Sequence, residues 1–165
     1  MASVHNPPRK VSKVALIVGG LTALFLLLSL PASIRYARES GSLYLFSHDF
    51  IKDIPKRLTG PGRFRFVLQP LIATVLGVRS GRADARTGRP PYLYGVLFKN
   101  EHRRVLMKDA FATIAILLMM GILLDSICQW LIFGISYPGA ALVVGPVLIV
   151  TPYTVARALT NRLSR

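Results

Sequence analysis

Asp125 is the side chain whose type and position in this 165-residue chain point most directly to chemistry. It is the one charged residue in the apolar run 110–133, and Gln129 follows one helical turn later on the same face. An ionisable group inside a membrane-spanning helix is costly, so it is a candidate functional site by default. Asp125 with Gln129 is therefore a candidate intramembrane polar site, suited to a proton relay or an ion site.

The depth of Asp125 supports a second interpretation. Asp125 lies about 22 Å along the helix from Ala110, which places it near the far headgroups of a bilayer. Trp130 and Tyr137 have the positions expected of the aromatic belt at that surface. In this interpretation, which we favour, Asp125 is half-solvated and pairs with an arginine.

A set of arginines between the apolar runs forms the second chemical group. Guanidinium groups bind phosphate in a bidentate manner, so these side chains are candidate contacts for anionic lipid headgroups. Their stretch lacks the spacing of phosphate-binding glycine loops, and a solvated basic loop on the cytoplasmic side is the simpler interpretation. The candidate lipid contacts are Arg79, Arg82, Arg86, Arg89, Arg103 and Arg104.

Metal and catalytic sites are not indicated by the sequence. His48, Asp49 and Asp53 lie in one stretch with lysines between them and no second histidine, so we interpret them as surface residues. The single cysteine, Cys128, excludes an intrachain disulfide and belongs to no zinc spacing. Because no catalytic motif is recognisable, we expect a protein that is not an enzyme and has no cofactor and no metal.

Long apolar segments must position these residues. A helix needs about 20 apolar residues to cross a hydrocarbon core. Segments 110–133 and 140–156 meet this length without a polar face, and they predict two transmembrane helices joined by an external turn at 134–139. A third run, 14–32, follows a disordered basic start at 1–13 and predicts the first transmembrane helix, which Pro31 ends or kinks. A secretory signal is the alternative for 14–32.

Region 33–109 is basic and predicts two further elements. Leu43, Phe46, Phe50 and Ile54 recur at spacings of three and four, which predicts an amphipathic interfacial helix at 42–54 that Pro55 stops. Segment 66–78 is apolar but reaches only roughly 20 Å as a helix. We therefore expect it to dip into the membrane without crossing it.

The charge balance bears on the partners. The chain has 21 Lys+Arg against 7 Asp+Glu, a net charge of +14. Because the basic residues flank apolar blocks, anionic phospholipids are the expected partners, and we expect no binding to nucleic acid.

Basic residues also predict the topology, because they stay on the cytoplasmic side of a membrane. The basic stretch before 110 and the basic tail 157–165 predict a cytoplasmic C-terminus. Counting basic residues favours three spans with 33–109 inside and the N-terminus outside. Four spans remain open, since that arrangement also keeps an excess of basic residues inside.

The blocks RFRFVLQPLIATVLGVRSGRADARTGRPPYLYGVLF at 63–98, YPGAAL at 137–142 and PYTVARALTNR at 152–162 resemble recurring parts of an uncharacterised family of short bacterial inner-membrane proteins. The resemblance implies a bacterial inner-membrane location. It implies no activity and no functional residue.

Together these features predict an all-α integral membrane protein with three transmembrane helices, an interfacial amphipathic helix and a short membrane-dipping segment. The expected role is non-enzymatic, as an accessory or structural subunit that packs against a larger membrane complex. The alternative is a small transporter or ion-coupled protein that uses Asp125, in which Pro146 and Pro152 interrupt the last helix.

Overall fold

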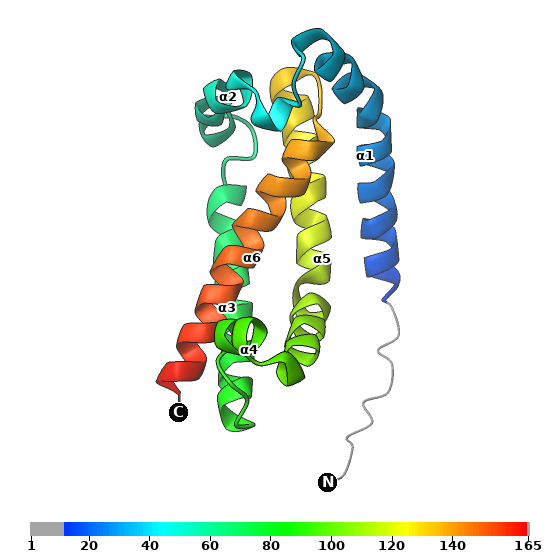
Figure 1. The fold of residues 1–165 in the computed structure, drawn as a ribbon. Helices are drawn as coiled ribbons and strands as arrows, with labels where there is room; N and C mark the ends of the chain where they lie inside the picture. Colours follow the sequence, from blue (N-terminus) through cyan, green and yellow to red (C-terminus); the bar gives the residue numbers. More distant parts are fainter. Residues whose placement is uncertain (1–11, 165) are drawn as a thin grey trace.

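The computed structural model describes residues 12–164, and every regular element within them is a helix (Figure 1). Helices α1, α5 and α6 are long and apolar enough to cross a membrane. The prediction of an all-α chain with three such helices is confirmed, and these helices indicate a multi-pass membrane protein. Most of the predicted disordered start, 1–11, lies outside the described residues. In chain order the elements are α1 (Lys13–Ser40), the 3-10 turn η1 (Tyr44–Phe46), α2 (His48–Thr59), α3 (Arg65–Arg86), α4 (Tyr92–Phe98), α5 (Asn100–Phe133) and α6 (Pro138–Leu163).

Local sequence explains where the long helices begin and end. The Ser12 hydroxyl accepts a hydrogen bond from the Ala15 N–H and caps the start of α1. Gly41 and Gly134 end α1 and α5 with φ values of 70° and 68°, a left-handed conformation that glycine adopts without steric cost. Pro31 lies inside α1, so of the two effects expected of it, an end or a kink, it does not end the helix.

α3 is longer than the segment predicted at 66–78. It continues to Arg86 because it packs closely beside α6 (Figure 1). A Cβ on Gly77 would lie 2.5 Å from the Tyr153 carbonyl oxygen, and one on Gly81 would lie 2.5 Å from the Arg157 carbonyl oxygen. These glycines therefore allow two helix backbones to meet.

The two halves of region 33–109 lie at opposite ends of the bundle. α2 lies beside the turn between α5 and α6, whereas α4 lies beside the start of α5 and the end of α6 (Figure 1). Arg57 pairs with Asp125 and Arg89 pairs with Asp109, and these two aspartates are about 24 Å apart along α5. If α5 crosses a membrane, the two halves face different sides. The prediction that all of 33–109 lies on one side does not fit this arrangement.

The predicted helix at 42–54 is instead the turn η1 followed by α2. The Ser47 hydroxyl accepts from the Phe50 N–H and caps α2. Pro55 lies inside α2 and does not stop it. Phe46 and Ile51 are exposed, and Arg57, near the end of α2, is buried in the bundle.

Candidate functional site

Asp125 lies in a buried ionic cluster at the α2 end of the bundle. Its Oδ1 is 2.5 Å from Arg65 Nη1, and its Oδ2 is 3.5 Å from Arg57 Nη1. Asp125 is 1% exposed, Arg65 2% and Arg57 3%. The structure thus pairs Asp125 with arginines as expected, but it places the carboxylate fully inside the protein and not in a half-solvated position.

Gln129 connects this cluster to the turn between α5 and α6. Its side-chain Nε2 donates to Asp125 Oδ2 at 2.6 Å, and its Oε1 accepts from the Tyr137 N–H at 3.0 Å. The candidate pair Asp125 and Gln129 is therefore brought together. The amide of Gln129 holds both the carboxylate and the start of α6 in place.

Aromatic rings surround Arg57. Its guanidinium carbon lies 5.4 Å from the Phe50 ring centroid, 5.5 Å from that of Phe133 and 5.7 Å from that of Tyr44. Such rings present a negative face to a cation, which offsets part of the cost of burying it. The Tyr44 ring in turn stacks on Tyr137, with centroids 3.8 Å apart. The end of α2 is thereby fixed against the α5–α6 turn.

Tyr44 also links the cluster to the surface. Its hydroxyl donates to Asp53 Oδ2 at 2.9 Å and lies 3.5 Å from Arg57 Nη2. Burial raises the pKa of Tyr44 to about 12, with Asp53 adding to the rise and Arg57 opposing it. Tyr44 is therefore a neutral hydrogen-bond donor at every physiological pH.

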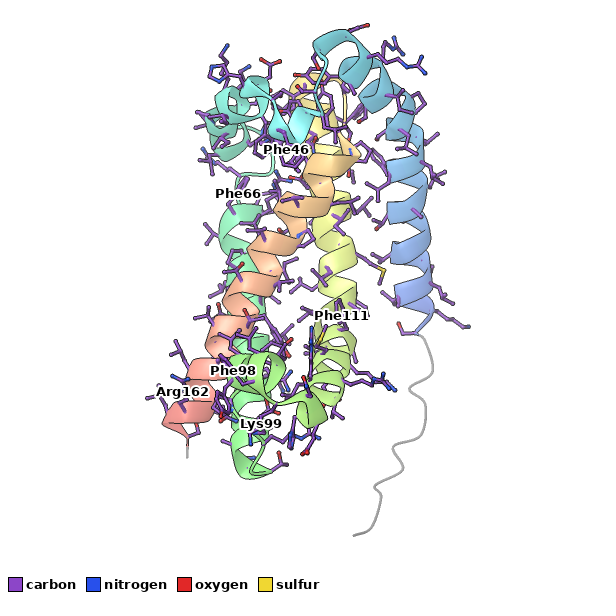
Figure 2. All side chains as sticks on the ribbon, in the orientation of Figure 1. Phe46, Phe66, Phe98, Lys99, Phe111 and Arg162 are labelled. Atoms are coloured by element: carbon purple, nitrogen blue, oxygen red, sulfur yellow. The ribbon has the colours of Figure 1, made fainter. Side chains whose placement is uncertain are left out.

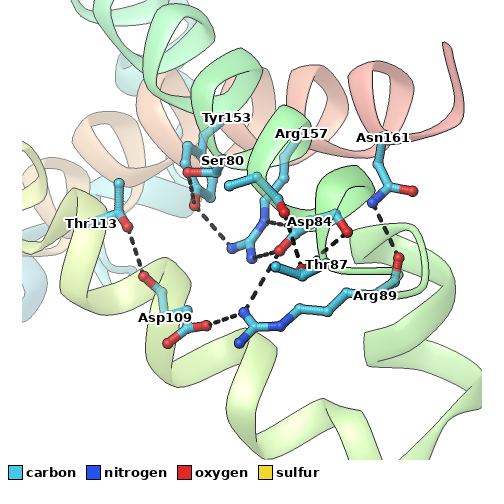
Figure 3. A network of polar contacts seen from close by, with 10 residues as sticks. Ser80, Asp84, Thr87, Arg89, Asp109, Thr113, Tyr153, Arg157 and Asn161 are labelled. Carbon is cyan, nitrogen blue, oxygen red and sulfur yellow. Dashed lines mark hydrogen bonds and ion pairs between the residues drawn. The ribbon is translucent and has the colours of Figure 1, made fainter. Parts of the chain in front are cut away.

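A second ionic cluster joins α3 to α6 at the other end of the bundle (Figure 3). Arg157 donates from Nε to Asp84 Oδ2 at 2.6 Å and from Nη2 to Asp84 Oδ1 at 3.0 Å. Its Nη1 donates to the Tyr153 hydroxyl at 3.0 Å, and that hydroxyl lies 3.3 Å from Ser80 Oγ. Each carboxylate oxygen and each guanidinium nitrogen of this pair has a partner, so the cluster is a structural connection with no group left for chemistry.

Arg89 extends the second cluster to α5. Its Nη1 lies 2.7 Å from Asp109 Oδ2 and 3.8 Å from Asp84 Oδ1, and its carbonyl accepts from Asn161 at 3.2 Å. Arg89 is therefore part of this internal network, and a lipid headgroup would have to compete with Asp109 and Asp84 for its guanidinium. The other five predicted lipid contacts are exposed: Arg79, Arg82, Arg86, Arg103 and Arg104.

The structure places the remaining candidates at the surface of the α2 end. Asp49 accepts from the Tyr36 hydroxyl at 2.7 Å, and Asp53 pairs with Lys56 at 2.9 Å. Within residues 12–164, no three His, Cys, Asp or Glu side chains gather in a way that could hold a metal ion.

Sequence reasoning expected an arginine partner for Asp125 but did not identify Arg57 and Arg65, and it missed the pair of Asp84 with Arg157. One signal was present for the first: Arg65 directly precedes the apolar start of α3, and a carboxylate buried in an apolar helix requires a cation. For the second pair no local signal exists, because its members are 73 residues apart and each lies in a stretch that reads as a basic membrane flank.

No protein-family model, curated protein or solved structure matches the chain. The resemblance to short bacterial inner-membrane proteins therefore stays a prediction. The function has to be argued from the geometry.

Proposed function

We propose that the chain is a non-enzymatic protein of the bacterial inner membrane, an accessory or structural subunit that packs against a larger membrane assembly. The observation that carries this proposal is the state of α1. Of the 18 most apolar consecutive residues of α1, only 17% are buried within the fold, against 28% of the corresponding residues in α5 and in α6. A helix attached so lightly to its own bundle presents a long apolar side to lipid or to another protein.

The apolar part of α1 packs along α5, and Tyr36 near its end also contacts Tyr44 of η1 and Tyr137 before α6. Thr22 donates to the Val18 carbonyl at 2.7 Å and lies 3.2 Å from the Met119 carbonyl, and Gly19 lies against the Met119 sulfur. On the outward side, a Cβ added at Gly20 would meet no atom within 4 Å. Small residues on such a face let a second helix approach closely, which suits a docking helix.

The proposed topology has four crossings, with both termini in the cytoplasm. α3 supports a crossing because Arg65 and Asp84 are about 29 Å apart along it, close to the hydrocarbon thickness. Between Arg65 and Arg79 the exposed residues of α3 are apolar, among them Val67, Leu71 and Val75. Arg79 and Arg82 are also exposed, and long arginine side chains near the end of a crossing extend toward the headgroups. Figure 2 shows Lys99 and Arg162 toward the same end of the bundle. Basic residues are most numerous at that end, which supports its assignment to the cytoplasm.

A transporter that uses Asp125 has less support from the geometry. Asp125 already faces two arginines and an amide, so it is not a free carboxylate along a pathway. The centre of the bundle is also tightly packed. A Cβ on Gly145 would lie 3.0 Å from the backbone of Gly121, so α5 and α6 touch there.

Anionic phospholipids are the second proposed partner. Five exposed arginines lie at the α4 end, and a cation near an anionic membrane surface contributes about 1 kcal/mol. These arginines are exposed, whereas Asp84 and Arg157 are buried, so headgroup binding would not disturb the interior. The five arginines are Arg79, Arg82, Arg86, Arg103 and Arg104.

Site-specific photocrosslinking in native membranes tests the subunit proposal. A photoreactive amino acid replaces Leu24 on the outward side of α1, and a matched control replaces Leu71 on the outward side of α3; the two side chains are 53% and 57% exposed. We expect a discrete protein adduct from position 24 and lipid adducts from position 71. Lipid adducts alone at position 24, with no co-purifying protein, would contradict the proposal.

A further inference from the structure

The cluster around Asp125 carries more positive charge than its carboxylate balances. Two guanidinium groups, Arg57 and Arg65, face one carboxylate, and none of the three is more than 3% exposed. A buried charge without a partner is expensive, so an excess of one unit inside the bundle requires a counter-charge. We propose that Arg57 and Arg65 bind a small monovalent inorganic anion of the halide class.

The neighbouring groups do not supply the missing negative charge. Asp53 is the nearest other carboxylate on α2, and it pairs with Lys56 at 2.9 Å. The Tyr44 hydroxyl donates to Asp53, and the rings around Arg57 carry no net charge. Among residues 12–164, the ion pairs at this end of the bundle therefore leave Arg57 and Arg65 with Asp125 as their shared carboxylate.

Hydrogen-bond donors in the cluster are also unsatisfied. Within residues 12–164, Nε and Nη2 of Arg65 and Nε of Arg57 are buried without a hydrogen-bond partner. Gln69 lies one turn after Arg65 on α3, and both its amide nitrogen and its amide oxygen are likewise buried and unpartnered. That nitrogen lies 3.7 Å from the Cβ position of Gly121, one turn before Asp125 on α5. Unsatisfied donors from two helices, α2 and α3, thus belong to side chains that pair with the carboxylate or lie one turn from it, and donors are what an anion requires.

The burial and the charge together define the class of ligand. The excess is one positive unit, which a monovalent anion neutralises. A lipid phosphate carries its headgroup and glycerol with it, and the near-complete burial of both arginines leaves no exposed guanidinium for such a group. Guanidinium is more weakly hydrated than ammonium, so a weakly hydrated halide suits it.

Anion-dependent stability tests this site in the full-length protein. The protein is placed in nanodiscs of zwitterionic phosphatidylcholine, and its Tm is measured in sodium chloride, bromide and gluconate at one ionic strength. A ligand that binds the folded state alone raises Tm, and a tenfold excess over its dissociation constant should raise it by about 3–6 °C for a chain of this size. We expect this rise in chloride and bromide and not in gluconate.

Two variants separate the site from general salt effects. Arg57→Met leaves Arg65 and Asp125 as a balanced pair, so the dependence of Tm on halide should disappear. Arg63→Met removes the same charge from an exposed position in the neighbouring loop, and the Tm of this variant should still depend on halide. If Arg57→Met does not fold, chloride-35 NMR line broadening on the unmodified protein, displaceable by bromide, provides the second measurement.

Three results would overturn the proposal. One is the same Tm in all three salts. Another is an equal halide effect in the unmodified protein and Arg57→Met. The third is stabilisation by added phosphatidylglycerol and not by halide, which would assign the counter-charge to a lipid headgroup. None of these depends on whether α1 crosslinks to a partner protein.

Discussion

The carboxylate of Asp84 and the guanidinium of Arg157 meet at two points, with oxygen–nitrogen distances of 2.6 and 3.0 Å. They join α3 to α6 across 73 residues of sequence, and both are buried. A two-point pair restricts orientation as well as distance. Together with the contacts of Gly77 and Gly81, it holds the second half of α3 beside α6.

Replacing Asp84 by Asn should destabilise the protein strongly. The change leaves the Arg157 guanidinium buried without its carboxylate, and loss of one partner of a buried pair costs about 3–5 kcal/mol. The free energy of unfolding in detergent, followed by helical circular dichroism, measures this. Asp109→Asn is the matched control: the Asp109 side chain is 45% exposed and its pair with Arg89 should contribute less than about 1 kcal/mol. Equal losses in the two variants would contradict the account.

Replacing Gly81 by Val should separate α3 from α6. The new Cβ would meet the Arg157 carbonyl oxygen at 2.5 Å, and a backbone atom cannot move aside as a flexible side chain can. Overpacking of this kind costs about 1–3 kcal/mol. Gly20→Val provides the comparison, because no atom lies within 4 Å of a Cβ at that position. The same unfolding measurement should show a much smaller change for Gly20→Val, and a reversed order would refute the packing.

Replacing Asp125 by Asn should be more damaging than an ion-relay role would require. The variant leaves Arg57 and Arg65 buried with no carboxylate, so we expect a loss of at least about 3 kcal/mol and a low yield of folded protein. A second change, Arg65→Met, should restore part of the stability by removing one buried charge. Unchanged stability of Asp125→Asn would support the transporter interpretation instead.

The Tyr44 phenol should resist ionisation up to about pH 12. An unfolded chain loses this proton near pH 10, so the folded state binds the proton more tightly between these values. The contribution to stability is therefore complete below pH 10 and is lost as pH rises toward 12. The titration is followed by tyrosinate absorbance in the unmodified protein and in Tyr44→Phe. The variant should lack the component that titrates near pH 12. If the component that the variant lacks titrates near pH 10 instead, the burial of Tyr44 is contradicted.

The sequence was sufficient for the long apolar helices and for the expectation that Asp125 pairs with an arginine. Runs such as 14–32 and 110–133 cannot be solvated by water, so length and composition decide their structure. The pairing of Asp125 with an arginine followed from the cost of an isolated charge. The burial of Asp125 could not be predicted from the sequence, because it depends on the packing of Arg57 of α2 and Arg65 of α3 against it.

The extent of α3 could not be read from hydropathy. Its second half carries Arg79, Arg82 and Arg86, which lower the apolar score, and Gly77 and Gly81 read as helix breakers. Both glycines are explained only by the α6 backbone that they contact. The one-sided placement of 33–109 does not fit the positions of α2 and α4 at opposite ends of the bundle, because counting charges does not place helices.

Labelling of single cysteines with a membrane-impermeant maleimide tests the central claim, that α3 crosses the membrane and both termini are cytoplasmic. Cys128 is replaced by Ser, and cysteines are placed one at a time at the exposed positions Arg63, Arg103 and Ser164. In spheroplasts, we predict labelling at position 63 and none at positions 103 and 164 until the membrane is broken. Equal protection or equal labelling at positions 63 and 103 would place both on one side and contradict the account.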